Sequence, residues 1–486
     1  MTRKLILLPV LVCLIAAGLT AQRPKLPEGL TVQLDRSTVN LYDTVTGKVD
    51  GLGPGEKFTV DLVDVHGRVT ARQELKRTGF RGTPFRLQVR WFSTPVMTVL
   101  ATGDSKRTGK AQLRCIPPSH GWETYLLVTA DVSVASHMDR ANVLRLLGFQ
   151  TGLAGDASAV SALSSRDLRA LVSGGTGGGF AVTAGDVATA LRDFETRTTK
   201  SDYSALRRIP CLSAANVSAT TLAALNDRVT PLATYNPVGY VLLDHPGITP
   251  ENRAIDFCFD PETLTAFRTW LKRRYAGVGV LSRRWDVKFR RWEDVTPMTV
   301  GEVLKREFAA RRRGTLLNFA PWADHRAFMD ETFGTAVTAL AQQARLTHRG
   351  VRTGLRGGLA PAAYGGYDWT YLAEAFDFME CADGTFKRLA ASLNRQRVHP
   401  AYTLGTVTDQ GGAAAFVREL WTNAANGDLG AVVEPGTALL DGRGLPTPLA
   451  YKARPALSAL KGLGHVMVDK EFVPTGKGVY LYYSQP

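Results

Sequence analysis

Cysteine is scarce in this chain of 486 residues, which has only Cys13, Cys115, Cys211, Cys258 and Cys381. The five are widely spaced and form no Cys-x-x-Cys pair, which excludes a small domain held together by disulfides. We expect scattered buried thiols, and one disulfide between two of them remains an alternative.

Long apolar runs are missing beyond the N-terminus. There, Thr2-Arg3-Lys4 precedes the apolar run Leu5–Leu19 and a small-residue end at Ala21. This is the pattern of a secretory signal peptide, and the run is short for a membrane span of about 20 residues. We predict that residues 1–21 are a signal peptide and that the protein is exported to the periplasm or the extracellular space. We expect no membrane association after cleavage.

Acidic residues are outnumbered, 44 against 59 Lys and Arg, and the net charge is +15. A net positive charge of this size is typical of proteins that bind nucleic acid. The arginines are nevertheless spread along the chain, and the densest group, Arg311–Arg313, lies in a helical pattern without interleaved aromatic residues. We therefore expect no nucleic-acid binding, but a solvated Arg-rich face with affinity for anionic surfaces as a side effect.

Phosphate-binding motifs are also lacking. The Gly-rich run at 174–179 does not follow a strand with GxGxxG spacing, so we interpret it as a loop. We predict no cofactor.

Residues 28–117 show a strand pattern of period two, as in Phe58-Val60-Leu62 and Phe85-Leu87-Val89, separated by Gly-rich turns. Short alternating strands of this kind predict an all-β sandwich of immunoglobulin-like shape. We expect a packing spacer, with carbohydrate or cell-envelope binding as the alternative, because fold alone does not give function.

From Trp122 onward the pattern changes to strands alternating with helices, which predicts a mostly parallel sheet. Eight strand candidates predict a (β/α)₈ barrel over residues 122–475, with its chemistry at the carboxyl ends of the strands. The candidates are Tyr125–Ala130, Phe149–Ala154, Phe180–Thr183, Gly239–Leu243, Val351–Leu355, Phe376–Met379, Ala401–Leu404 and Leu429–Val433.

The fourth candidate strand ends abruptly in Asp244-His245-Pro246-Gly247. Next, Asp260-Pro261-Glu262 has the residue types of an N-cap, a first-turn proline and a first-turn acid, and so predicts the start of a helix. We expect this helix to bury one apolar stripe, formed by Leu264, Phe267, Leu271 and Tyr275.

The run from Cys258 to Pro297, CFDPETLTAFRTWLKRRYAGVGVLSRRWDVKFRRWEDVTP, resembles the segment after the fourth barrel strand of family-42 glycoside hydrolases, the β-galactosidase-like group. Ala320–Asp330 and Tyr364–Trp369 resemble further pieces of the same group. The resemblance implies a retaining hydrolase of O-glycosidic bonds with a carbohydrate ligand. It also implies an acid/base Glu after strand four and a nucleophilic Glu after strand seven.

The chain departs from that pattern in its carboxylates. His245 stands where the family has the acid/base Glu, and Asp244 is the alternative. Strand seven has no Glu, so Asp409, beyond its end, is one candidate nucleophile. Glu380, ending strand six, and Glu434, closing strand eight, are the others. Each acid could instead cap a helix or pair with an arginine.

Aromatic rings in loops can stack on the faces of a sugar, and a neighbouring acid can bind its hydroxyls. On this basis we predict substrate binding by Tyr235, Trp322, Tyr367, Asp368, Trp369 and Trp421. Trp285 and Trp292 have helical spacing and are expected in the core. Asp324, His325 and Arg326 fit structural hydrogen bonding and catalysis equally well.

Two family features are incomplete. The family often carries a C-x-C-x-x-C cluster before the helix at Pro261, but this chain has Cys258, Asp260 and Thr263, so we predict no structural zinc and no other metal. Residues 476–486 resemble the start of the family's trimerisation domain. We expect that this domain is either cut short or lacking here, and the oligomeric state stays open.

Two functions therefore remain. One is an exported, retaining glycoside hydrolase of β-galactosidase type. The other is a catalytically degenerate barrel that binds glycans or cell-envelope polysaccharide without cleaving them, which the His245 replacement favours.

Overall fold

The computed structural model describes residues 29–78, 81–90, 94–116, 122, 125–130, 138–173, 203–207, 211–244, 258–356, 368–381, 402–434 and 437–468. The chain divides into two compact units. The first consists of the chain up to Arg90 together with Met97–Arg114, and the second of Trp91–Val96 and Cys115–Pro486. The predicted signal peptide and the segment 476–486 lie outside the described residues, and the predicted domain boundaries stay predictions.

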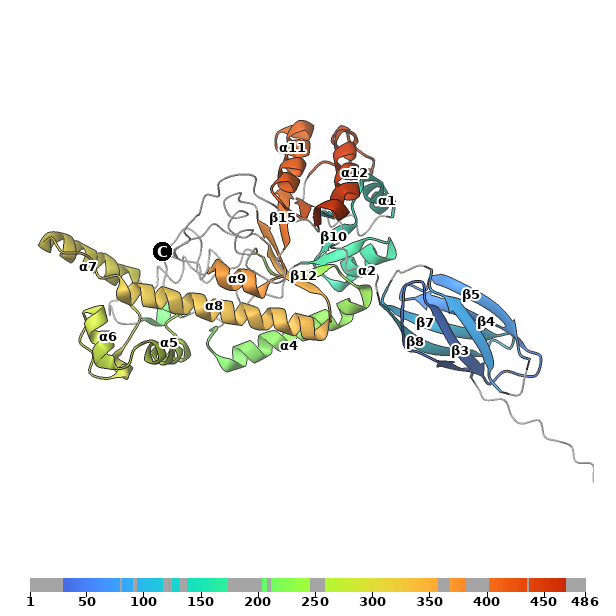
Figure 1. The fold of residues 1–486 in the computed structure, drawn as a ribbon, viewed down its shortest axis with the longest axis horizontal. Helices are drawn as coiled ribbons and strands as arrows, with labels where there is room; N and C mark the ends of the chain where they lie inside the picture. The colour runs from blue at the N-terminus through green and yellow to red at the C-terminus, as the bar shows by residue number, and fades with distance from the viewer. Residues whose placement is uncertain are drawn as a thin grey trace, which may run out of the picture. The chain divides into compact units, whose positions relative to one another are not determined.

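The first unit is all-β, as predicted (Figure 1). One sheet has the order β1-β3-β6, from Thr31–Leu34, Thr44–Asp50 and Thr83–Gln88. The other has the order β2-β8-β7-β4-β5, from Thr38–Asn40, Thr108–Ile116, Val96–Gly103, Lys57–Asp64 and Val69–Lys76. Alternate side chains, such as Phe85 and Leu87 of β6, are buried. The immunoglobulin-like shape stays a prediction.

The second unit contains a closed barrel of eight parallel strands, which confirms the predicted (β/α)₈ architecture. In ring order the strands are β9 (Leu126–Thr129), β10 (Thr151–Ala154), β11 (Arg169–Val172), β12 (Gly239–Asp244), β13 (Arg352–Arg356), β14 (Phe378–Cys381), β15 (Tyr402–Val407) and β16 (Gly430–Val433). We call them strands one to eight of the barrel. β16 pairs with β9 and closes the ring.

The third strand is not where the sequence placed it. Arg169–Val172 pairs with β10 on one side and with β12 on the other, so the ring has no place for a strand from 180–183. Those residues lie outside the described part of the chain. The prediction failed because Arg169, Ala170 and Leu171, three of the four residues of β11, are good helix formers, so the local sequence does not indicate a strand.

Helices cover the outside of the barrel, joined by a few short 3₁₀ turns. They are α1 (Met138–Leu147), α2 (Ala157–Ser165), η2 (Tyr203–Leu206), α4 (Ala215–Leu232), η3 (Ala233–Tyr235), α8 (Ala320–Thr347), α9 (Trp369–Ala375), α11 (Gly412–Ala425) and α12 (Pro448–Val468). Between β12 and α8 the chain inserts α5 (Pro261–Arg274), α6 (Val278–Trp285), η4 (Trp292–Asp294) and α7 (Val300–Arg313). Figure 1 shows these inserted helices along the end of α8 that lies away from the barrel strands.

α5 forms as the sequence predicted. Oδ1 of Asp260 accepts a hydrogen bond from the amide of Glu262 at 3.2 Å, and Pro261 occupies the first turn. Phe267 and Leu271 are buried, and Leu264 and Tyr275 pack against the same core.

The barrel interior is filled by apolar side chains from alternate strand positions, among them Leu126, Val128, Phe378, Leu404 and Val432. Trp122 closes the end at which the strands begin. Its indole N–H donates to the carbonyl of Val238 at 2.8 Å, and its ring lies 5.0 Å from that of Phe378. The interior is therefore a packed core, and only the opposite end of the barrel is available for chemistry.

Candidate active site

The inward-facing positions turn polar at the carboxyl ends of the strands. In each of strands five to eight, a polar residue follows the last interior position by two places. We call these four residues the polar layer: Arg356, Glu380, Thr406 and Glu434. Side chains alternate across a strand, so each of these residues faces the same way as the residue two places before it. Gly354 precedes Arg356, and a Cβ there would meet the Phe378 ring at 2.5 Å. This glycine therefore leaves room for Phe378 beneath Arg356.

Arg356 joins the acids of the polar layer. Its Nε donates to Oε2 of Glu380, and its Nη2 donates to Oε1 of Glu434 at 2.5 Å. Thr406 donates to Oε1 of Glu380 at 3.3 Å. One guanidinium from strand five thus reaches carboxylates on strands six and eight.

Burial and charge shift the pKa values of this group. Burial raises the pKa of Glu380 to about 6, against the lowering effect of Arg356. Burial lowers the pKa of Arg356, but Glu380, Glu434 and Asp244 together raise it above its ordinary value. Arg356 is therefore a permanent cation that the surrounding acids hold in place.

Asp244 ends strand four and is exposed. It lies in register with Arg356 on the neighbouring strand, and its charge acts on that guanidinium. Strands four and eight are opposite each other in an eight-stranded ring. Asp244 and Glu434 therefore stand on opposite sides of the same barrel end.

The acids on strands six and eight are close together. Oε1 of Glu380 and Oε1 of Glu434 lie 3.5 and 2.5 Å from the same nitrogen of Arg356, so these two oxygens are at most about 6 Å apart. This is below the spacing of about 6.5–9.5 Å of inverting glycosidases. However, both acids bind the same guanidinium, and the Glu380 side chain is only 4% exposed, against 28% for Glu434. Glu434 is thus the acid of this pair that a substrate could reach.

Asp409 has a structural contact. It follows β15, and its Oδ2 accepts a hydrogen bond from the amide of Ala438 at 3.1 Å, in the loop after β16. This hydrogen bond ties two loops together, and it is neither the helix cap nor the arginine pair that we considered for each acid.

Two predicted sugar-binding aromatics lie toward the wrong end of the barrel. Tyr235 is in η3, just before strand four begins, whereas Asp244 is where that strand ends. Trp421 is in the second half of α11, which runs back from the carboxyl end of β15 toward the start of β16. Substrates of such barrels bind at the carboxyl ends, so the structure does not bring these two residues to the polar layer.

Trp369 is fully buried in the core around the barrel, so its ring presents no face to a sugar. Asp368 caps α9, because its Oδ1 accepts from the amide of Thr370 at 2.8 Å. Trp322 lies in the first turn of α8, on the part of that helix that meets the inserted helices. His245 and Tyr367 lie outside the described residues.

The Asp324-His325-Arg326 group is structural. Oδ2 of Asp324 accepts hydrogen bonds from the hydroxyl of Tyr275 at 2.6 Å and from the indole of Trp285 at 2.7 Å. His325 is fully buried among aromatic rings, and burial lowers its pKa well below the usual value. Neither residue is placed to act on a substrate.

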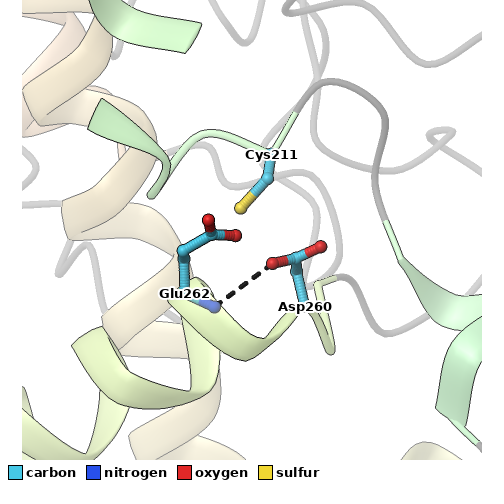
Figure 2. Close-up of side chains that lie close together, drawn as sticks. All are labelled: Cys211, Asp260 and Glu262. Atoms are coloured by element: carbon cyan, nitrogen blue, oxygen red, sulfur yellow. Dashed lines mark hydrogen bonds between the residues drawn. The ribbon is translucent and has the colours of Figure 1, made fainter. Parts of the chain in front are cut away.

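A second polar cluster lies at the start of α5 (Figure 2). Single ligand atoms of Cys211, Asp260 and Glu262 lie within 4.8 Å of one another. The Cys211 sulfur is 3.1 Å from the hydroxyl oxygen of Thr263. A hydrogen bond from Cys258, opposed by burial, lowers the pKa of the Cys211 thiol to about 6. Cys258, Asp260 and Thr263 therefore all converge on Cys211.

This cluster does not fit the structural zinc site that the family resemblance would imply. Such sites use four Cys or His ligands. Here a threonine hydroxyl and an aspartate stand at two of the three motif positions, and that Asp260 already accepts the helix-capping hydrogen bond. The exposed Glu262 adds a second carboxylate in place of a thiolate.

Comparison with known proteins gives structural matches only. No family model and no curated protein sequence matches the chain. A β-galactosidase from the psychrophilic Marinomonas ef1 matches with 11% identity and a TM-score of 0.51, over 71% of this chain and 62% of that one. This chain shares its barrel fold with a glycosidase.

Two further matches have lower scores. Gan42B, a GH42 β-galactosidase, matches at 10% identity and a TM-score of 0.47, over 72% of this chain and 58% of that one. The catalytic domain of a β-amylase from Paenibacillus polymyxa matches at 13% identity and a TM-score of 0.48, over 70% and 98%. The chain spans less than two thirds of the length of both β-galactosidases. The likeness to the Marinomonas ef1 protein, at 11% identity, concerns the fold alone and leaves the chemistry to the site itself.

Two central residues, Arg356 and Cys211, were not predicted from the sequence. Arg356 could have been noticed as the only charged residue at the end of strand five, directly before Gly357-Gly358. Cys211 is 47 positions from Cys258, and no local pattern connects the two.

Proposed function

We propose that this chain is an exported glycoside hydrolase that acts on O-glycosidic bonds of β-galactoside type with retention. The observation that carries the proposal is the placement of Asp244 and Glu434 on opposite strands at the carboxyl end of a closed barrel. Glycoside hydrolysis needs two carboxyl groups that face one sugar from opposite sides.

Exposure separates the roles of the acids. Asp244 is exposed, so a substrate can reach it, and it stands at the end of strand four, where the family resemblance implies the acid/base residue that protonates the leaving oxygen. Glu434 is partly exposed and oriented by Arg356, which suits a nucleophile. Glu380 is buried and does not reach a substrate, so we assign it the positioning of Arg356.

The finer parts of the proposal have separate support. The β-galactoside class is inferred from the β-galactosidase of Marinomonas ef1, which shares the fold, and from the sequence resemblance. Export comes from the signal-peptide pattern of residues 1–21.

The test is hydrolysis of a panel of nitrophenyl glycosides by the purified protein. We expect turnover of a β-galactoside, and we expect Asp244→Asn and Glu434→Gln to lower kcat by about 10²–10⁴-fold. Asp227→Asn, at an exposed position on α4, is the matched control and should keep full activity. Equal activity of all three variants would refute the assignment of Asp244 and Glu434.

A glycan-binding barrel without hydrolysis is the second candidate. It is favoured by a specific observation: Arg356 holds the acids of both strand six and strand eight, while strand seven ends in Thr406-Val407 without an acid. Absence of turnover on every glycoside, together with polysaccharide binding that Asp244→Asn weakens, would establish this function. If neither turnover nor binding is found, both candidates are wrong.

A further inference from the structure

α7 is a helix that contributes nothing to the core. Of its described side chains, from Gly301 to Arg313, none is buried. Figure 1 shows it beside the end of α8 that lies away from the barrel strands. A capping box of Thr299 and Glu302 begins α7, and Gly314 in the left-handed conformation ends it. Arg306 connects α7 to α6 by donating to the carbonyl of Trp285 at 3.0 Å.

Large apolar side chains are exposed on α7 and in the segment that follows it. Leu304 is 56% exposed and Phe308 is 66% exposed, and they lie one turn apart on the same face. Leu316 and Phe319, just beyond the helix, are 98% and 53% exposed. A helix that leaves its apolar side chains in water has a face that another surface can cover.

Basic side chains surround this apolar face. Lys305, Arg311 and Arg312 project on either side of Phe308, and the Arg312 guanidinium lies 5.9 Å from the centre of the Phe308 ring. Glu307, one of only two acids between 300 and 319, pairs with Arg311 at 2.5 Å, whereas that stretch has five basic residues. We define the α7 face as Leu304, Lys305, Phe308, Arg311 and Arg312.

The charge decides which partner fits the α7 face. A second copy would bring the same cations against it, in a chain of net charge +15. A nucleic acid would use the cations but leave Leu304, Phe308 and Leu316 in water. An anionic lipid surface uses both, because the acyl boundary accepts leucine and phenylalanine while the headgroups pair with Lys and Arg.

We propose that the α7 face, continued by Leu316 and Phe319, docks onto an anionic lipid bilayer, with α7 lying in the plane of the interface. Within the described residues, no helix is long and apolar enough to cross a bilayer, so the contact is peripheral. The proposal replaces the expectation from sequence that the mature chain has no membrane contact. It does not depend on the proposed glycosidase function.

The test is co-sedimentation of the full chain with lipid vesicles. We expect binding to vesicles of phosphatidylcholine with one third phosphatidylglycerol, no binding to pure phosphatidylcholine, and weaker binding as sodium chloride is raised. Leu304→Ser with Phe308→Ser should weaken binding about tenfold or more, because two apolar side chains no longer enter the bilayer. Arg311→Gln with Arg312→Gln and Arg313→Gln should also weaken it about tenfold or more.

The matched controls make the same kinds of substitution at exposed positions on other helices. Leu146→Ser with Tyr451→Ser removes two exposed apolar side chains from other helices. Arg418→Gln, Lys452→Gln and Arg454→Gln together remove three exposed cations from α11 and α12. Both controls should bind anionic vesicles within about twofold of the unchanged protein, because exposed substitutions leave the fold intact. Circular dichroism of every variant verifies the fold.

Several results would overturn the proposal. One is equal loss of binding in the controls and in the α7 variants. Another is a dimer, in the absence of lipid, that Leu304→Ser with Phe308→Ser dissociates, since the face would then be a subunit contact. A third is DNA binding that requires Arg311–Arg313 but not Phe308, without vesicle binding, which would make the face a nucleic-acid site.

Discussion

At the scale of single residues, Arg356 organises the carboxyl end of the barrel. Removing one partner from a buried, hydrogen-bonded ion pair leaves an uncompensated charge, so Arg356, Glu380 and Glu434 are expected to depend on one another. The group also explains why an acid on strand six can matter without touching a substrate: Glu380 fixes the guanidinium, and the guanidinium fixes Glu434.

The raised pKa of Glu380 predicts a specific dependence of stability on pH. Its folded-state pKa of about 6 exceeds the ordinary value of 4.5, so the folded protein binds more protons between these values. The stability that this carboxyl contributes is therefore fully present below pH 4.5 and is lost as pH rises through 6, by about 2 kcal/mol. Glu380→Gln should lack this loss, as measured by denaturant unfolding between pH 4.5 and 7.5.

The control is Glu293→Gln, which removes an exposed acid and should follow the unchanged protein at every pH. The quantity to compare is the difference in unfolding free energy between the protein and each variant, because all other carboxylates then cancel. A Glu380→Gln difference that stays constant over this pH range would contradict the assigned pKa.

At the scale of elements, Asp324 ties the inserted helices to α8. Tyr275 lies at the end of α5 and Trp285 at the end of α6, and both donate to the same oxygen of Asp324. Arg274 adds an ion pair at 3.3 Å. One carboxylate, 5% exposed, thus fixes the ends of two helices on a third.

Asp324→Asn should destabilise this helical insertion by about 2–3 kcal/mol, because hydrogen bonds to a charged acceptor are lost and an amide N–H₂ is left facing donors. Chemical denaturation measures the loss. Glu307→Gln is the control, since its ion pair with Arg311 is exposed and should be worth less than about 1 kcal/mol. Equal effects of the two substitutions would show that Asp324 is not a structural anchor.

At the scale of the whole molecule, we expect closure of the barrel to depend on Trp122, which packs where the strands begin, as well as on strand pairing. Trp122 contacts the start of strand four through Val238 and strand six through Phe378, and Arg352 of strand five lies 5.6 Å from its ring centre. It therefore bridges three neighbouring strands at the end of the barrel that carries no chemistry.

Trp122→Ala should lower the free energy of unfolding by about 3–5 kcal/mol, because a cavity opens in a packed interior. Trp421→Ala removes the same side chain from an exposed position on α11 and should cost less than about 1 kcal/mol. Thermal melting of the two variants makes the comparison. A small effect of Trp122→Ala would mean that the barrel does not need this side chain in order to close.

Most of the strands and helices could be predicted from the residue types and the spacing of apolar residues in short stretches of the sequence. Seven of the eight barrel strands fell close to their predicted places, because each is a short, mostly apolar run, and several of these runs end just before a stop at Gly155, Pro246 or Pro435. The α5 cap at Asp260, and the burial of Phe267 and Trp285, followed from residue types and helical spacing. β11 was not predicted, because Arg169, Ala170 and Leu171 favour a helix and local propensity therefore gave no sign of a strand.

The sequence by itself determined that an all-β part precedes an α/β part, that the α/β part forms a barrel, and which acids stand at its strand ends. The reason is that the spacing of apolar residues, two in strands and 3.6 in helices, is a property of the local sequence. Only the tertiary structure decided that Arg356 joins Glu380 to Glu434, that Cys211 meets Cys258, and that Trp369 is buried. The physical reason is that ring closure, and not the local chain, sets the distance between residues tens of positions apart.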